Sequence, residues 1–169
     1  FARFLDAGWR HEVQRSDGRD GFNGSDLSEP SQPQLDALQD RLCYQFSDLT
    51  LLKRALTHRS AGRHHNERLE FLGDAVIGLA AASAFYNRFP DADEGVLSRL
   101  RALVVSGHSL AAIAKDRDLS SCLILGESER KSGGRHRDSI LANTLEALLG
   151  AVALDAGPET ALQVAGEWL

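Results

Sequence analysis

Two long segments of this chain are almost free of charge, and both have the length of helices rather than strands. No charged residue lies between Asp74 and Arg88, and Glu146 is the single charge between Ser139 and Leu154. A helix that is apolar on all sides is normally buried against other helices. The sequence therefore predicts a helical protein built around two buried apolar helices.

The remaining apolar residues also recur at helical spacing, and no stretch alternates with period two for long enough to form a sheet. A loop rich in glycine and charge is expected at 126–135. The fold class is accordingly all-α. The first helical region is expected to begin at Leu35, with apolar positions continuing to Leu56, and a long helix is expected from Glu67 to Tyr86. Another helix is expected to begin at Asp93 or Glu94 and to continue through Val104 toward Ile113. The last two are expected from Ser139 to Leu154 and from there to Leu169.

The composition is that of a soluble globular protein, with 43% hydrophobic and 25% charged residues. No apolar run is expected to reach the length needed to cross a bilayer, so no membrane partner is expected and the cytoplasm is the expected location. Cys43 and Cys122 are too few for a thiolate zinc site and are interpreted as buried free thiols.

The acidic residues are unevenly distributed along the chain. The net charge is −5, but residues 1–40 carry four Arg against eight acidic residues and so account for −4 of it. Residues 1–34 are rich in Gly, Ser, Asp and Arg and are interpreted as a flexible polar extension before a folded domain at 35–169. The domain itself is nearly neutral, which is compatible with a phosphate-binding face.

Three acidic residues interrupt the first apolar helix on one side. Glu67, Glu70 and Asp74 stand at positions i, i+3 and i+7, within about 60° of one another around a helix. Acids on a solvated helix face would be unremarkable, but here they adjoin an apolar helix and are expected to be partly desolvated. Desolvated carboxylates require cations to stabilise their charge.

The second apolar helix repeats this pattern. Asn143 precedes Glu146 by three residues, and Gly150 lies on the same side, where a missing side chain would allow close helix contact. If the two helices pack together, their oxygen ligands converge, and such ligands suit Mg²⁺ or Mn²⁺. Two ions about 3.5–4 Å apart could activate water and stabilise the leaving oxygen of a phosphodiester.

Other chemistries lack their signatures. No His stands three residues after a Glu, as di-iron helical bundles require. No Gly-x-Ser-x-Gly elbow and no Walker phosphate loop occurs. The histidines have no metal-ligand spacing and are assigned structural or surface roles.

Five blocks of the sequence, in order, resemble the ribonuclease III family. The most specific is HNERLEFLGDAV at 65–76, which is similar to the family signature. The similarity covers about 35–169 and leaves 1–34 uncovered. The other four blocks are ALTHRS at 55–60, DEG at 93–95, KSGG at 131–134 and DSILANTLEA at 138–147.

The resemblance implies a homodimeric all-α endonuclease domain that cuts double-stranded RNA with Mg²⁺, for which Mn²⁺ can substitute. The products would carry 5′-phosphate and 3′-hydroxyl ends with two-nucleotide 3′ overhangs, in ribosomal and messenger RNA processing, and no small molecule would be a substrate. Phe71 matches an aromatic residue that inserts into the partner subunit. Metal ligands match at Glu70, Asp74, Asn143 and Glu146, and catalytic acids at Glu67, Asp74, Glu94 and Glu146.

Asn143 departs from the family pattern, which has an acidic ligand at this position. An amide oxygen can still coordinate Mg²⁺ but brings no charge. Weaker metal affinity is therefore expected. The alternative function is a catalytically weakened or silent module that binds double-stranded RNA.

The loop after Gly126 is the expected contact for the RNA backbone, through its glycines and through the cations Arg130, Lys131, Arg135 and Arg137. Bacterial relatives carry a separate double-stranded-RNA-binding domain after the catalytic one. This chain stops at Leu169, where the linker to such a domain would start. The domain alone is expected to bind RNA weakly and with steep salt dependence.

Overall fold

The computed structural model describes residues 29–169, and within that range it contains no β-strand. This confirms the all-α prediction. Most of the expected extension, 1–28, lies outside the described residues. The helices, with short 3₁₀ turns labelled η, are α2 (Gln32–Leu42), α3 (Leu49–Leu56), η3 (Arg59–Ala61), α4 (Glu67–Arg88), α5 (Glu94–Val104), α6 (Gly107–Asp116), η4 (Leu119–Cys122), α7 (Glu127–Lys131), η5 (Gly134–His136), α8 (Asp138–Ala156) and α9 (Pro158–Trp168).

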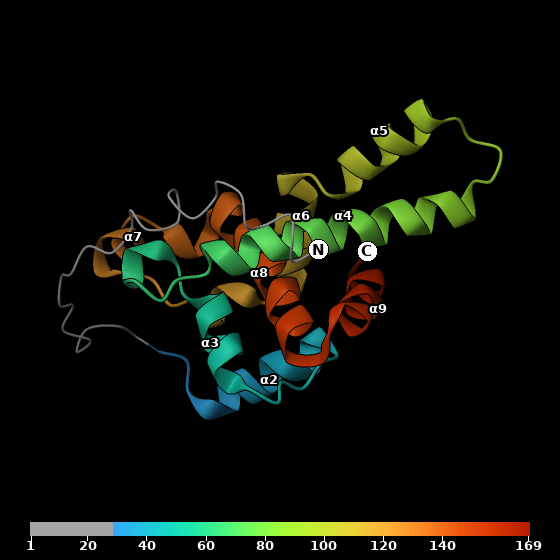
Figure 1. The fold of residues 1–169 in the computed structure, drawn as a ribbon. Coiled ribbons are helices and arrows are strands. Elements are labelled where there is room, and N and C mark those ends of the chain that lie inside the picture. Colours follow the sequence, from blue (N-terminus) through green and yellow to red (C-terminus); the bar gives the residue numbers. More distant parts are fainter. Residues whose placement is uncertain (1–28) are drawn as a thin grey trace, which may run out of the picture.

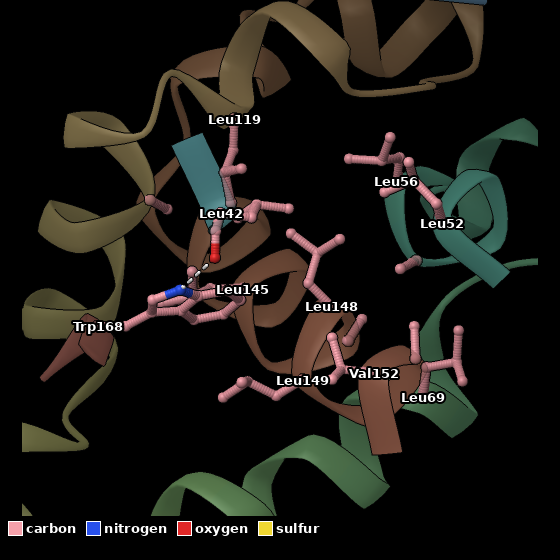
Figure 2. Packing of buried hydrophobic residues seen from close by; sticks show 14 of the residues in the cluster. Leu42, Leu52, Leu56, Leu69, Leu119, Leu145, Leu148, Leu149, Val152 and Trp168 are labelled. Carbon is pink, nitrogen blue, oxygen red and sulfur yellow. Dashed lines mark hydrogen bonds between the residues drawn. The ribbon is translucent and has the colours of Figure 1, made fainter. Parts of the chain in front are cut away.

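Helix α8 is the centre of the core. Eleven of its residues are buried, among them Leu145, Leu148 and Leu149, because α3, α4, α6 and α9 all pack against it. Figure 2 shows these leucines among residues of the surrounding elements. At one edge of this cluster the indole Nε1 of Trp168 donates a hydrogen bond of 3.1 Å to the Leu42 carbonyl oxygen. The prediction of a buried apolar helix is confirmed here.

Helix α4 is buried on one face only, so the prediction that it is buried all round was wrong. Its residues Leu69, Ile77 and Ala81 are buried, whereas Phe71 and Tyr86 on another face are 83% and 72% exposed. In Figure 1 the second half of α4 extends beyond the body of the molecule, beside α5. Helix α5 itself has no buried residue.

Both α4 and α8 are long and apolar enough to cross a membrane by length and composition alone, which corrects the expectation that no segment has that length. Of the apolar 18-residue stretch in each helix, 61% is buried inside the protein in α8 but only 33% in α4. Burial within the fold therefore accounts for the apolar character of α8. Much of the apolar surface of α4 is not covered by the described residues, 29–169.

Helices α4 and α8 cross at two glycines, as predicted for Gly150. A Cβ atom on Gly73 would lie 1.7 Å from the Glu146 carbonyl oxygen, and one on Gly150 would lie 2.1 Å from the Leu69 carbonyl oxygen. Any side chain at either position would force the two backbones apart. The crossing therefore fixes which residues of α4 face which residues of α8.

Several expected boundaries differ from the structure. Helix α2 begins at Gln32, three residues before the expected domain start. The single helix expected through Val104 to Ile113 is two helices. Helix α5 ends at Val104, and Ser106 is the N-cap of α6, where its hydroxyl accepts a hydrogen bond from the Ser109 N–H. The expected loop at 126–135 contains α7. Cys122 is buried as predicted, but Cys43 is exposed, so that part of the prediction was wrong.

The C-terminal end of α8 is tied to the loop between α2 and α3. The carboxylate of Asp155 accepts hydrogen bonds from the Tyr44 hydroxyl at 2.7 Å and from the backbone N–H groups of Ser47 and Asp48 at 2.8 and 2.9 Å. Burial acts to raise the pKa of Asp155, but these three hydrogen bonds outweigh it and lower the pKa. The carboxylate thus stabilises the packing of α8 on the N-terminal helices.

Candidate active site: a carboxylate cleft

The crossing of α4 and α8 forms one side of a cleft of about 810 Å³. Its other side is formed by η3 and by residues at and after α7. The volume falls within the range of pockets that hold small ligands. The lining residues that bear charged or polar side chains are His58, Arg59, Ser60, Asn66, Glu67, Glu70, Asp74, Glu129, Arg137, Ser139, Asn143 and Glu146.

The α4–α8 side brings together the predicted ligands Glu70, Asp74, Asn143 and Glu146. Burial, and then the charges of Asp74 and Glu70, raise the pKa of Glu146 to about 7. Burial and the charge of Glu67 also raise the pKa of Glu70, while a hydrogen bond with Asn143 acts to lower it. Acids from the two apolar helices therefore converge as predicted, and the resulting rise in pKa is largest for Glu146.

Two other predicted acids lie in different places. Glu67 lines the cleft one turn before Glu70, where Oε1 lies 3.3 Å from Nη1 of Arg59. Glu94 does not line this cleft: it begins α5, where its carboxylate accepts a 2.6 Å hydrogen bond from the Ser98 hydroxyl. Five of the six predicted ligands and catalytic acids thus share one cleft.

The donor set fits hard divalent cations, although its side chains are not closed into a cage. Within residues 29–169, no three His, Cys, Asp or Glu side chains are arranged to hold a metal ion. Carboxylates that lack a cation repel one another, so an open arrangement is expected. In this same range no Lys or Arg pairs with Glu70, Asp74 or Glu146. The ligands would be carboxylate and amide oxygens, which Mg²⁺ and Mn²⁺ prefer.

The opposite wall contains residues that the sequence analysis missed. His58 had been assigned a structural or surface role, but it lines the cleft together with Arg59 and Ser60. Gly126 packs directly on η3: its N–H donates to the Ser60 hydroxyl at 3.0 Å, and a Cβ atom there would lie 2.1 Å from the Ser60 carbonyl oxygen. The matching block at 55–60 was a signal for these residues, but no spacing rule assigned them a role.

The four cations predicted to bind RNA are separated by the structure. Arg137 lines the cleft and pairs with Glu129 at 2.7 Å. Arg135 donates to the Ser120 carbonyl oxygen at 2.8 Å and so ties η5 to η4. Arg130 is exposed on α7, and Lys131 on the same helix pairs with Glu127. Only Arg137 of the four lies at the carboxylates.

Comparison with known proteins relates both the sequence and the fold to one family. The model of the family described as Ribonuclease-III-like matches residues 48–169. Ribonuclease 3 of Mannheimia succiniciproducens is 50% identical over 134 residues, and that of Psychromonas ingrahamii is 50% identical over 137; these matches cover 79% and 81% of this chain. The chain spans about 60% of the length of each of these curated relatives.

Solved structures agree with the sequence matches. A nuclease domain of ribonuclease III from Campylobacter jejuni has a TM-score of 0.78 and 41% identity, covering 79% of this chain and 94% of that one. Dicer from Pichia stipitis has a TM-score of 0.55 and 29% identity, covering 72% of this chain and 52% of that one. From the family model, the identity and the shared fold together, the chain belongs to the ribonuclease III family.

Proposed function

We propose that this chain is the catalytic domain of a divalent-metal-dependent endoribonuclease that hydrolyses phosphodiester bonds of double-stranded RNA. Its products would carry 5′-phosphate and 3′-hydroxyl ends with two-nucleotide 3′ overhangs. Ribosomal and messenger RNA precursors in the cytoplasm are the proposed substrates. Membership of the ribonuclease III family supports the substrate class, and the cleft supports the metal dependence.

The observation that carries the proposal is the uncompensated charge of the cleft. Five carboxylates against two guanidinium groups give its lining a formal charge of −3 when all the carboxylates are ionised and His58 is neutral. Both guanidinium groups are already paired, Arg59 with Glu67 and Arg137 with Glu129. A phosphodiester would be repelled by such a surface unless cations bound there first.

The residues that would hold these cations are Glu70, Asp74, Glu146 and, through its amide oxygen, Asn143. When bound, Mg²⁺ or Mn²⁺ would supply a Lewis acid for the phosphoryl oxygens and a water of lowered pKa. The carboxylates of Glu146 and Asp74 would also be able to accept hydrogen bonds from a water molecule and so orient it. Asn143 also affects Glu70 directly, because it acts to lower the pKa of that carboxyl.

A homodimer is proposed from the second apolar face of α4. Phe71, Leu79 and Tyr86 lie within about 80° of one another around the helix and are 83%, 54% and 72% exposed. Ala75, Gly78 and Ala82 lie between them on this face and would allow another helix to approach closely. Beside Phe71 a groove of about 510 Å³, lined in part by Leu72 and Leu154, could receive an aromatic ring of a second copy. A self-complementary arrangement of this kind suits a two-fold dimer.

A second candidate function rests on Asn143. Because this amide supplies no charge, the site has one negative ligand fewer than the family pattern. The chain would then bind double-stranded RNA and cut it slowly or not at all. Retention of Glu67, Glu70, Asp74 and Glu146 in one cleft favours the nuclease.

A cleavage assay separates the two functions. A 30-base-pair RNA duplex would be incubated with the protein in Mg²⁺, in Mn²⁺ and in EDTA. The nuclease predicts cuts on both strands in either metal and none in EDTA, and loss of cutting in Glu146→Gln. Intact RNA in both metals, with duplex binding retained, would instead establish the silent module.

A further inference from the structure

The wall opposite the carboxylates is closely packed, and its one carboxylate, Glu129, is paired with Arg137. Besides the contact between Gly126 and η3, Gly134 fixes this wall, because a Cβ atom there would lie 2.7 Å from the Glu129 side chain. The carboxylate of Glu129 is thereby turned to Arg137. The proposed metal ligands all come from the α4–α8 side, and this wall presents His58 and Arg59 to the same cleft.

The contact of Arg59 with Glu67 uses only one of the two terminal nitrogens of its guanidinium group. Its side chain is 71% exposed, and its one ion pair within the described residues is to Glu67 at 3.3 Å, which is longer than the ~2.7–2.9 Å of a strong charge-assisted hydrogen bond. A guanidinium group carries five N–H donors in a planar fork that matches phosphate. Glu67 therefore positions the group at the cleft without saturating it.

His58 adds one further donor. Its Nδ1 accepts the Ser60 backbone N–H at 3.2 Å and lies 2.8 Å from the Ser60 hydroxyl, so the neutral ring carries its proton on Nε2. Burial is the main cause that lowers the pKa of His58, which keeps the ring neutral near pH 7. In the part of the chain that the structure describes, no hydrogen bond of Nε2 occurs. This N–H is available to an acceptor in the cleft.

Arg59 and His58 lie at the start of η3, and Arg59 meets α4 at its first residue, Glu67. Glu67 precedes the proposed ligands Glu70 and Asp74 by three and seven residues, which are rises of about 5 and 10 Å along the helix. We propose that Arg59 and His58 bind a backbone phosphate of the RNA strand other than the one that is cut, and thereby set where the strand is cleaved. Both are positioning residues in this role. The inference rests on the proposed substrate, double-stranded RNA.

Binding of a 30-base-pair RNA duplex, measured at several salt concentrations in EDTA and in Ca²⁺, tests this role without relying on cleavage. Arg59→Ala should weaken binding about tenfold and reduce the slope of log K against log salt concentration by about 1. Arg59→Lys keeps the charge and should keep the slope. Arg99→Ala removes an exposed cation of α5 outside the cleft and should change neither quantity.

His58→Asn separates the Nε2 donor from the structural role of the ring. An Asn side chain can still accept the Ser60 N–H but lacks a donor at the position of Nε2. It should weaken binding about threefold and leave the salt slope unchanged, because the imidazole is neutral. In Mg²⁺ or Mn²⁺, both His58→Asn and Arg59→Ala should spread the cleavage positions over neighbouring nucleotides.

Thermal melts of each variant report whether it folds. If folded Arg59→Ala binds with the wild-type affinity and slope in both buffers, the phosphate site is refuted, while cutting by the wild-type protein would still support the nuclease. If the wild-type protein never cuts but its binding depends on Arg59, the nuclease proposal fails and the phosphate site stands.

Discussion

Helices α4 and α8 have similar sequences in physical terms and different surroundings in the fold. Each is long, apolar and interrupted by acids on one side. Eleven residues of the 19 in α8 are buried, against six of the 22 in α4. The apolar pattern predicts that a surface will be covered but does not say whether the same chain covers it. The excess apolar face of α4 is what the proposed dimer would bury.

Two leucines test this contrast most directly. Leu148 of α8 is fully buried and Leu79 of α4 is 54% exposed. Leu148→Ala should lower the free energy of unfolding by about 3–4 kcal/mol, through lost burial and a cavity. Leu79→Ala should lower that of the monomer by less than about 1 kcal/mol. Urea denaturation at low protein concentration measures both, and equal losses would show that α4 is as enclosed by its own chain as α8.

The contact between the two helices should be the next most sensitive point. Gly73→Ala places a methyl group against the Glu146 carbonyl oxygen and should cost about 2–3 kcal/mol, because backbone must move. Gly166→Ala in α9 is the matched control, since a Cβ atom on Gly166 meets nothing within 4 Å. This substitution should be neutral or stabilising. A Gly73→Ala protein as stable as wild type would contradict the close crossing.

The open face of α4 can be tested through Phe71. Truncation of a central aromatic residue in an interface typically costs about 2 kcal/mol, so Phe71→Ala should raise the dimer dissociation constant about 30-fold. Sedimentation velocity over a range of concentrations measures this constant. Leu169→Ala removes an exposed apolar side chain that follows α9, and it serves as the control. A wild-type protein that is monomeric at every concentration would leave the face without its proposed partner.

The end of α8 gives a prediction about pH. Asp155→Asn should lower the free energy of unfolding by about 1–2 kcal/mol at pH 7, because it weakens the hydrogen bonds from Tyr44, Ser47 and Asp48. Since the folded state lowers the pKa of Asp155, this contribution is complete above the unfolded value of about 3.9 and is lost as the pH falls through the folded value. The difference between wild type and variant should therefore be constant from pH 7 to 5 and shrink below about pH 4. A constant difference at low pH would argue against a charged acceptor.

The sequence predicted the parts of the fold and site that depend on local spacing. The positions of Glu70 and Asp74 on one face of a helix, and the role of Gly150, follow from helical periodicity alone. The wall containing His58 was not predicted, because its residues meet the carboxylates only through the packing of η3 on Gly126. For the same reason, the separation of Glu94 from the cleft depends on the direction of α5, which periodicity does not specify.

The smallest expected effect concerns Asn143, the one proposed ligand that departs from the family pattern of acidic residues. Asn143→Asp adds a fourth carboxylate beside Glu70 and Glu146, so it should raise the charge repulsion in the metal-free protein and strengthen metal binding. The concentration of Mg²⁺ that gives half-maximal cleavage should fall about tenfold, by analogy with the effect of ligand-supporting residues on metal affinity. The melting temperature should fall in EDTA and rise more steeply with Mn²⁺ than in the wild type. Asn143→Ala is the matched control, because it removes the amide without adding charge and should weaken the metal response. If Asn143→Asp changes neither the metal titration nor the melting temperature, residue 143 is not part of the cation site, and α8 contributes only Glu146 to it.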